Sequence, residues 1–272
     1  MSFRPAKLGT SAEFEVIDYI QSEILKLLPY ITFSKLKREL KLLNYDFPNL
    51  GFKKFIRQLY QHEPEILYAI LTNNFLTLEK FVEFLRDGVI VTITGTRGSG
   101  KTDFAYLITE QLPDYLLVTN NHINNYNYVF CNSNRKLIEI FKREKEKPKI
   151  VVLDEAQEIF SAYSSVFSPH VKIFLKEQTY ARKNKSIFIY ICPELGTLSL
   201  PLRQASSFVV QKKEKTKALV YGKENPIPVV IRQIPKTRIE FNTLEKATWK
   251  KEKIKSKRDD YLNSDLGDFM ND

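Results

Sequence analysis

The chain has 272 residues, of which 43% are hydrophobic and 27% charged, and these proportions are typical of a globular protein with a buried core. Two cysteines are too few for a disulfide framework, and the three scattered histidines lack the spacing of a zinc site. No run approaches the ~18 consecutive apolar residues of a membrane span, and the first residues lack the apolar segment of a signal peptide. We therefore expect a soluble, cytoplasmic protein with no membrane span.

The formal net charge is +10 and the pI is about 9.3. A lysine-rich composition, with lysine on every solvated face, would explain this charge. A polyanionic partner such as DNA would explain it as well, because clustered cations gain affinity by releasing counterions from phosphates. Three stretches concentrate the charge: Lys142–Lys149, Lys212–Lys217 and Lys246–Arg258. The first alternates lysine with glutamate, as solvated helix ends do, whereas the last has few acids and is the best candidate for a DNA contact.

Residues 1–88 show the apolar spacing of short amphipathic helices. We expect helices over about 14–28, 36–43, 52–59 and 77–87, with Pro29, Pro64 and Gly88 at or near the ends of the first, third and fourth. Cations lie between the apolar stripes, so the segment could form a helix-turn-helix module. We favour the alternative of a helical cap or an oligomer contact, because no recognition-helix signature stands out.

From residue 89 the pattern changes to short β-branched runs separated by helical stretches, at 89–94, 115–119, 150–153, 186–191 and 208–210. Near-continuous apolar strands of this kind predict an α/β fold, with a parallel sheet covered on both faces. Later runs at 218–221, 229–231 and 238–241 predict a β-rich C-terminal extension. We therefore divide the chain into an N-terminal helical module (1–88), a core with its β extension (89–245) and a flexible tail that is first basic and then acidic (246–272).

The segment GTRGSGKT, at 95–102, lies between an apolar strand and a helix and matches the pattern GxxxxGK[ST]. Glycines let backbone N–H groups curl around phosphates, and the helix N-terminus adds the positive end of its dipole. Lys101 would reach the β- and γ-phosphates, and the Thr102 hydroxyl would bind Mg²⁺. The Arg97 side chain is expected to point outward. The segment therefore predicts a site for ATP and Mg²⁺ formed by Gly95, Thr96, Arg97, Gly98, Ser99, Gly100, Lys101 and Thr102.

A second motif follows about fifty residues later, where the apolar strand Ile150–Leu153 ends in Asp154 and Glu155. The strand would place Asp154 at the C-terminal edge of the sheet, where α/β folds bind ligands, and there it can hold Mg²⁺ directly or through water. Glu155 can polarise the attacking water as a general base. The pair of motifs predicts an ATP-hydrolysing enzyme and disfavours a small-molecule kinase, which needs no water-activating carboxylate at this point.

These motifs, with YARKNKSIFIYI (180–191) and LSLPLRQASSFVV (198–210), resemble the HerA–FtsK superfamily of P-loop ATPases. The resemblance is greatest to its small viral branch, the packaging-type ATPases of archaeal viruses and the zonula occludens toxin-like (Zot) phage proteins. It covers about residues 89–211. It implies an ASCE-type P-loop NTPase fold in which 186–191 is inserted between the P-loop strand and the acidic strand, so that the strands lie in the order 5-1-4-3-2.

By the same resemblance, Arg182 occupies the place of an arginine finger that acts in a neighbouring subunit and neutralises charge on the transferred phosphoryl group. A surface arginine at a helix end is the alternative for this residue. Arg203 matches a second frequent arginine of the family. The chain departs from the family after the inserted strand, where members often carry a glutamine sensor and this sequence has Cys192-Pro193-Glu194.

The resemblance implies a DNA-directed motor that assembles as a ring, such as a hexamer, and translocates double-stranded DNA, with viral genome packaging as the leading version. Its location would then be the host cytoplasm, and a capsid or replication protein would be a further partner. Two alternatives stay open. One is an AAA+ initiator or loader for DNA replication, against which the β-rich segment after the core counts. The other is a nucleotide-gated adaptor whose output is partner binding.

Overall fold

The computed structural model describes residues 11–43, 52–162, 183–223 and 227–242, together with Thr179, Ala247, Trp249 and Lys250. Arg182 and most of the expected tail lie outside these residues. Among the helices that are described, none is long and apolar enough to cross a membrane.

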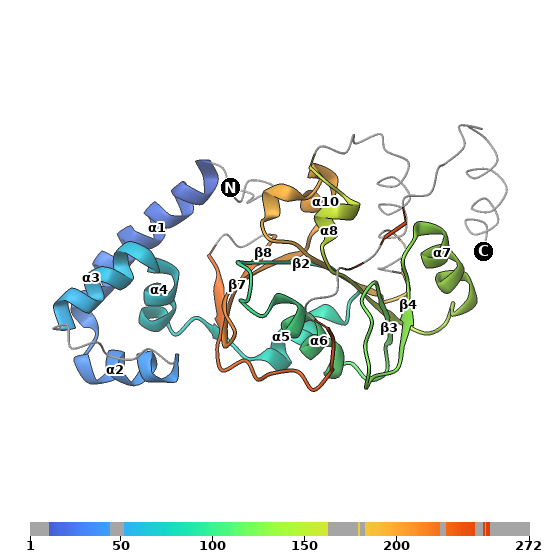
Figure 1. Cartoon of the computed structure of the whole chain (residues 1–272). Helices are drawn as coiled ribbons and strands as arrows, with labels where there is room; N and C mark the ends of the chain where they lie inside the picture. The colour runs from blue at the N-terminus through green and yellow to red at the C-terminus, as the bar shows by residue number, and fades with distance from the viewer. Residues whose placement is uncertain are drawn as a thin grey trace.

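Four helices and a 3-10 turn form the N-terminal part of the fold (Figure 1). They are α1 (Ser11–Leu27), η2 (Leu28–Tyr30), α2 (Phe33–Leu42), α3 (Phe52–His62) and α4 (Pro64–Thr72). The first three helices agree with the apolar spacing of the sequence. The helix α4 was not expected, because we interpreted Pro64 as the end of a helix. Pro64 is instead the first residue of α4, where the missing N–H of proline costs nothing because N–H groups in the first turn have no partner within the helix. Most of α4 is buried, so it has no polar face that would reveal a helical period.

A nine-stranded sheet forms the centre of the molecule, with the strand order β1-β9-β8-β7-β2-β6-β5-β3-β4. Its strands are β1 (Phe75–Leu76), β2 (Ile90–Thr94), β3 (Leu116–Thr119), β4 (Tyr128–Phe130), β5 (Lys149–Leu153), β6 (Ile187–Ile191), β7 (Phe208–Glu214), β8 (Lys217–Gly222) and β9 (Val229–Ile231). The five parallel strands β7-β2-β6-β5-β3 confirm the expected order 5-1-4-3-2. The strand β4 adds to β3 in parallel, and β8 and β9 continue from β7 in antiparallel pairs, which confirms a strand-rich C-terminal region.

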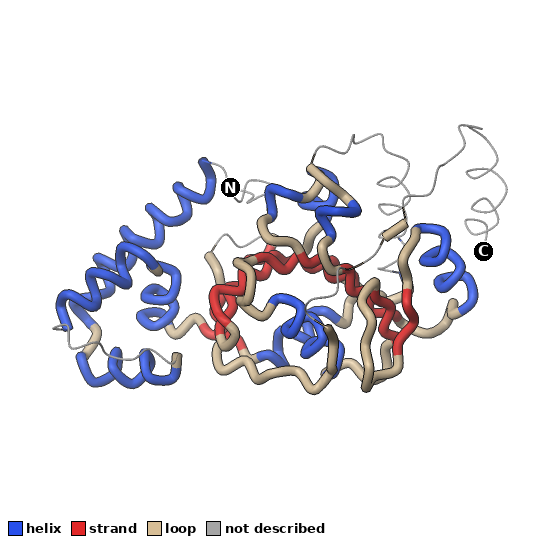
Figure 2. Tube along the Cα trace, in the orientation of Figure 1, coloured by secondary structure: helices blue, strands red, loops and turns tan. Residues whose placement is uncertain are grey.

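Helices cover both faces of this sheet, and Figures 1 and 2 show them above and below the strands. One face carries α5 (Leu78–Leu85) and α6 (Lys101–Glu110), whose buried side chains pack on β2, β5 and β6. The other face carries α7 (Asn134–Arg143), α8 (Ala156–Ile159), η3 (Leu195–Thr197) and α10 (Leu200–Ala205). Because β2, β5 and β6 are buried along their whole length, their sequences are mostly apolar and do not alternate with exposed polar residues, although Thr92, Thr94 and Lys149 are buried with them.

The N-terminal helices cover the part of the sheet that α7, α8 and α10 leave open. Val209, Leu219 and Val230 project from β7, β8 and β9 into the apolar cluster of α1–α4, whereas their neighbours Val210 and Val220 face α5 and α6. This alternation follows from the two-residue period of a strand. The helical module is therefore packed on the β extension of the core.

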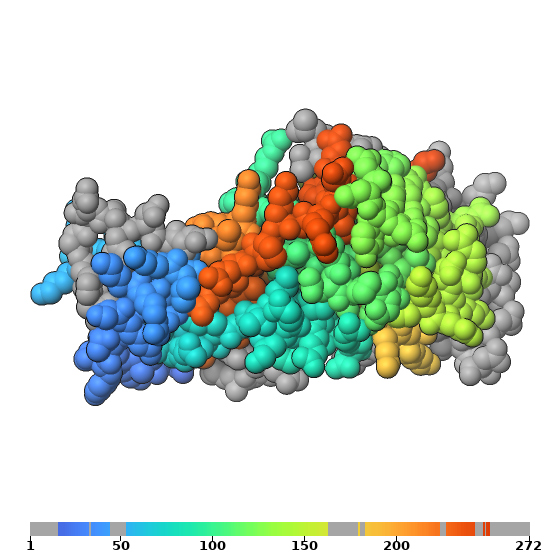
Figure 3. All heavy atoms as spheres, turned by 90° about the horizontal axis from the view of Figure 1, so that it is seen from below, coloured from blue at the N-terminus to red at the C-terminus, as the bar shows by residue number. Residues whose placement is uncertain are grey.

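One expected strand, at 238–241, is wrong. Only Phe241 makes a bridge, to Ile123. The reason lies in Glu110 at the end of α6, whose carboxylate accepts hydrogen bonds from the backbone N–H groups of Arg238 and Ile239. Backbone donors that are taken by a side chain are not available to a neighbouring strand. In Figure 3, which views the molecule from below, the orange-red segment after β9 runs from the N-terminal helices to the green loop after β3.

A partly buried ion pair joins the helical module to this segment. Glu39 of α2 accepts a hydrogen bond from Arg232 at 2.7 Å and another from Arg38 at 3.1 Å. Arg232 also lies 4.2 Å above the ring of Phe75. Burial by itself would raise the pKa of Glu39, but the two guanidinium groups outweigh it and lower the pKa. The pair is therefore a stabilising contact as long as Glu39 is ionised.

We expect Arg232→Leu to lower the free energy of unfolding by about 1–3 kcal/mol, because Glu39 stays buried with a weaker set of partners. The matched control is Arg38→Leu, since the Arg38 side chain is 70% exposed and its loss should cost less than about 1 kcal/mol. Urea unfolding measures both. A lowered pKa means that the stabilisation is present at pH values above the ordinary pKa of glutamate and is lost as the pH falls. The difference between wild type and Arg232→Leu should therefore shrink in acid, and equal stabilities at neutral pH would contradict the assignment.

Candidate active site

The segment 95–102 forms a tight loop between β2 and the first residue of α6. Gly95, Gly98 and Gly100 have φ values of +143°, +81° and +84°, which side chains other than hydrogen rarely allow. The loop is closed by a hydrogen bond from the Ser99 N–H to the Thr96 carbonyl, at 3.2 Å. Another bond, from the Gly95 N–H to the Pro193 carbonyl at 3.1 Å, holds its first residue beside the end of β6. The loop thus leads into the N-terminus of α6 at the C-terminal edge of the sheet.

The end of β7 and the turn that follows it pack closely against this loop. A Cβ atom on Gly95 would lie 2.4 Å from the carbonyl oxygen of Lys212, and one on Gly100 would lie 3.6 Å from the Cα of Lys215. The Lys212 side chain is buried, donates a hydrogen bond to the Lys215 carbonyl at 2.9 Å and lies 5.1 Å from the centre of the Phe104 ring. Burial lowers the pKa of Lys212 to about 8, although the nearby Asp103 opposes this shift. Lys212 therefore fixes the turn against the loop.

Lys101 lies at the start of α6, and its ammonium group donates to two carbonyls of the loop, those of Gly95 at 2.8 Å and Thr96 at 3.0 Å. These bonds hold the positive charge at the loop itself. Arg97 is exposed, as expected from the sequence. Ser99 is buried, and its hydroxyl has no hydrogen-bond partner within the described part of the chain.

Asp154 follows β5 and meets the P-loop segment at the same edge of the sheet. Its Oδ2 atom accepts hydrogen bonds from the Thr102 hydroxyl at 2.8 Å and from the Asn121 amide at 3.1 Å, and its Oδ1 atom accepts one from the Glu155 N–H at 2.9 Å. Burial raises the pKa of Asp154, while these hydrogen bonds act in the opposite direction. A threonine hydroxyl beside a carboxylate is a donor set that suits Mg²⁺, which binds oxygen and keeps part of its water shell.

Two asparagines that we did not expect in the site hold Asp154 in place. Asn120 brackets its backbone, since the Asn120 amide donates to the Asp154 carbonyl at 3.0 Å and accepts from the Asp154 N–H at 2.9 Å. Asn121 binds the carboxylate itself. We interpreted the asparagine-rich stretch only as a loop. Its position directly after β3, the strand beside β5, was the signal that could have placed it at the same edge.

Glu155 is exposed at the start of α8, and its backbone is in the left-handed region, with φ +51° and ψ +42°. A glutamate rarely adopts this conformation, and such residues cluster at functional sites. Its carboxylate accepts a hydrogen bond from the Gln157 side chain. The structure thus places Lys101, Thr102, Asp154 and Glu155 at one edge of the sheet, where the two motifs of the sequence meet.

None of the site contacts described above involves Arg203. Arg182 lies outside the described residues. Arg203 lies in α10, and its Nε atom is buried without a hydrogen-bond partner among the residues that the structure describes. Cys192 lies directly after β6, between the ends of β2 and β5, and burial raises the pKa of its thiol to about 12. It therefore remains a neutral, buried thiol at the position where the resemblance implies a polar sensor.

Residues 87–191, from the end of α5 to the end of β6, match the family model described as an AAA domain. The matched segment holds both the P-loop and the Asp154-Glu155 pair. The match covers less than half of the chain, so it says nothing about the N-terminal helices or the β extension. A comparison with curated proteins finds no match.

Several solved structures are similar to part of this chain. The genome packaging NTPase B204 from Sulfolobus turreted icosahedral virus 2, in complex with ATP-gammaS, is 12% identical, with 55% of this chain and 99% of that chain covered and a TM-score of 0.43. The N-terminal domain of zonular occludens toxin from Neisseria meningitidis is 18% identical, with 58% and 95% covered and a TM-score of 0.43. The conjugation coupling protein TcpA is 12% identical, with 54% and 60% covered and a TM-score of 0.38.

We expect Gly95→Ala to lower ATP affinity by at least about tenfold and to destabilise the fold by about 1–3 kcal/mol, because a methyl group would meet the Lys212 carbonyl and the φ value is strained for alanine. The control is Gly196→Ala, where a Cβ atom meets nothing within 4 Å. Titration with a fluorescent ATP analogue and urea unfolding measure the two effects. Wild-type affinity in Gly95→Ala would show that the turn does not constrain the loop.

Proposed function

We propose that the chain is a Mg²⁺-dependent ATPase whose catalytic site is the edge formed by the P-loop and Asp154. The observation that carries this proposal is the 2.8 Å hydrogen bond between Thr102 and Asp154, which joins the two motifs across 52 residues of sequence. The N–H groups of residues 95–102 and the start of α6 would bind the phosphates, and Lys101 would contact the β- and γ-phosphates. Thr102 and Asp154 would hold Mg²⁺, which neutralises phosphate charge when it is bound.

Glu155 is the proposed general base. A water molecule would attack the γ-phosphorus, the bond from this phosphorus to the bridging oxygen would break, and ADP would leave while Glu155 takes the proton of the water. Two observations support this role. The Glu155 carboxylate is exposed, and the Thr102 hydroxyl binds Asp154 and not Glu155. The Gln157 amide would orient it, since it donates to a Glu155 oxygen.

Two substitutions separate binding from hydrolysis. We expect Lys101→Ala to weaken ATP binding by about 10- to 100-fold, because a charge-assisted contact to phosphate is lost. Glu155→Gln should bind ATP normally and hydrolyse it at least about 100-fold more slowly, since an amide cannot accept the proton. Glu158→Gln is the matched control, as Glu158 is also exposed and lies in the same short helix. Normal hydrolysis by Glu155→Gln would assign the base to another residue.

The wider role that we propose is that of a DNA-directed motor built as a ring, such as a hexamer, with double-stranded DNA as its substrate and viral genome packaging as one form of this work. The support is the resemblance of residues 89–211 to the HerA–FtsK superfamily and the net charge of +10. In this proposal Arg182 completes the site of the neighbouring subunit, and Arg203 is a second catalytic arginine. A capsid or replication protein would be a further partner.

This wider role predicts an oligomer whose ATPase rate rises with double-stranded DNA, to be measured by native mass and by turnover with and without DNA. Mixing Arg182→Ala with Glu155→Gln tests the shared site. Each variant alone should be inactive, whereas random mixed rings should regain about a quarter of the wild-type rate, because an intact base and an intact arginine then meet at some interfaces. A monomer whose turnover ignores DNA would exclude the motor and leave the ATPase intact.

A further inference from the structure

The helices α2 and α3 carry a concentration of positive charge that the nucleotide site does not use. Their seven lysines and arginines are all exposed, and together they have a single acid, Glu39. That acid is buried and already paired with Arg232 and Arg38. The exposed cations are Lys35, Lys37, Arg38 and Lys41 of α2 and Lys53, Lys54 and Arg57 of α3.

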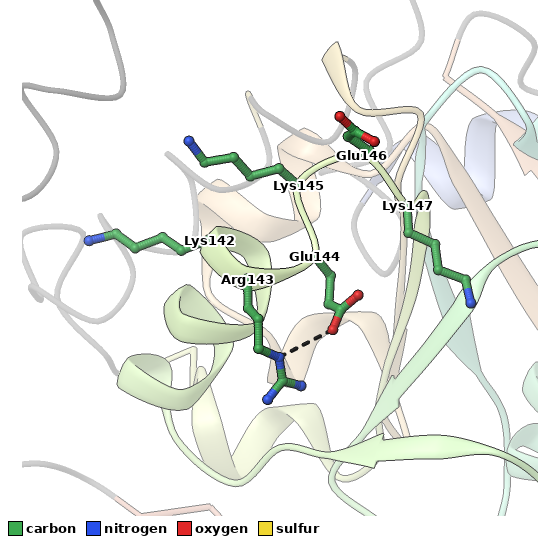
Figure 4. Close-up of a pocket in the computed structure, with 6 residues that line it drawn as sticks. All are labelled: Lys142, Arg143, Glu144, Lys145, Glu146 and Lys147. Atoms are coloured by element: carbon green, nitrogen blue, oxygen red, sulfur yellow. Dashed lines mark hydrogen bonds and ion pairs between the residues drawn. The ribbon is translucent and has the colours of Figure 1, made fainter.

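A general richness in lysine does not explain this arrangement, because it would mix cations with acids on every surface. The neighbouring helix α1 shows the opposite composition, with four acids and the single cation Lys26. The end of α7 shows the mixed case. There, Lys142, Lys145 and Lys147 alternate with Glu144 and Glu146 around an open surface hollow of about 410 Å³, and Glu144 pairs with Arg143 at 3.2 Å (Figure 4).

In the basic stretches at 142–149 and 212–217, three of the lysines are buried. Lys149 and Lys212 are buried, and their ammonium groups donate to backbone carbonyls. Lys217 is buried and pairs with Glu214 at 3.0 Å. The remaining cations of these stretches are mixed with Glu144, Glu146 and Glu214, whereas α2 and α3 are the described pair of helices with several outward cations and no exposed acid.

The helical period fixes the direction of these cations. On α3, Phe55, Ile56 and Leu59 are buried, so Lys53, Lys54 and Arg57 share the outer face, and Arg57 follows the two adjacent lysines by four and three residues. On α2, Leu36, Leu40 and Leu43 are buried in the same cluster, and Lys37 and Lys41 lie one turn apart on the outside. Like charges at this spacing repel one another in the free protein, and a polyanion bound to the surface would relieve the repulsion.

The chemistry between the cations favours nucleic acid over a membrane. Ser34, Gln58 and Gln61 are exposed among them, and such side chains donate hydrogen bonds to phosphate oxygens. A helix that lies on a membrane needs an outward apolar face to insert, but the apolar faces of α2 and α3 are buried against the rest of the protein. The exposed large apolar side chains of the described residues lie on other elements, such as Tyr19 and Leu25 of α1.

We propose that the outer faces of α2 and α3 bind the phosphate backbone of duplex DNA, at a surface separate from the ATPase site. This inference rests on the proposed function only in taking DNA as the partner. Nine residues separate the two helices, whereas a helix-turn-helix motif has a turn of three or four, so the surface contacts the backbone and does not insert a recognition helix to read bases. Binding should therefore be insensitive to DNA sequence and strongly dependent on salt.

The test compares two triple variants of the full-length protein that remove equal charge. K53A/K54A/R57A removes the cations of α3, and K142A/K145A/K147A removes those of the mixed surface after α7. Fluorescence anisotropy with a labelled 30-base-pair duplex, from about 50 to 200 mM KCl, gives the affinity and its salt dependence. We expect the α3 variant to lose at least about tenfold in affinity and to reduce the slope of log K against log salt by about 2–3, with the same loss on a scrambled duplex.

The second triple variant should retain affinity within about twofold, and both should keep wild-type ATPase turnover without DNA, since none of the six residues belongs to the proposed catalytic machinery. Equal losses in the two variants would overturn the proposal in favour of a general charge effect. Wild-type DNA binding by the α3 variant would place the DNA surface elsewhere and leave the motor intact. A wild-type protein that binds no duplex, or binds only vesicles of anionic phospholipid, would overturn both the surface and the DNA-directed role.

Discussion

The hydrogen bond from Thr102 to Asp154 can form only if two loops far apart in sequence leave the sheet at the same edge. Parallel pairing of β2 with β6 and of β6 with β5 meets this condition. Parallel strands in turn need crossover helices on the faces of the sheet, and the apolar side chains of α5, α6, α7 and α10 satisfy that need. The geometry of the site is therefore a consequence of burying both faces of the central strands.

Most of the features that could be predicted from the sequence depend on local patterns of residues. The strands β2, β5 and β6 are mostly apolar because both of their faces are covered, and the P-loop is a contiguous motif whose glycines have positive φ values. The order of the strands was different in kind. When several strands are equally buried, their sequences do not indicate which strands pair with each other. The position of β6 between β2 and β5 was therefore predicted from the family resemblance and not from apolar periodicity.

The features that sequence reasoning missed depend on contacts between distant residues. Lys212 belongs to a basic stretch, yet its side chain is buried. Its ammonium group donates a hydrogen bond to the Lys215 carbonyl, and its own carbonyl lies next to Gly95. Asn120 and Asn121 gain their role only because β3 lies beside β5. The segment 238–241 has the composition of a strand, but Glu110 captures its backbone donors. In each case a tertiary partner overrides the local preference.

The position of β2 also affects how the chain can fold as it is synthesised. Both neighbours of the P-loop strand, β6 and β7, lie roughly 100 residues further along the chain. Until β6 and β7 have been synthesised, both edges of β2 have unpaired backbone N–H and C=O groups. Until then, the apolar cluster of α1–α4 also lacks the side chains that β7, β8 and β9 contribute to it. Long-range parallel pairing of this kind is slow and leaves aggregation-prone strands exposed until it is complete. The nucleotide site is therefore among the last parts of the protein to be completed, although its defining loop is made in the first half of synthesis.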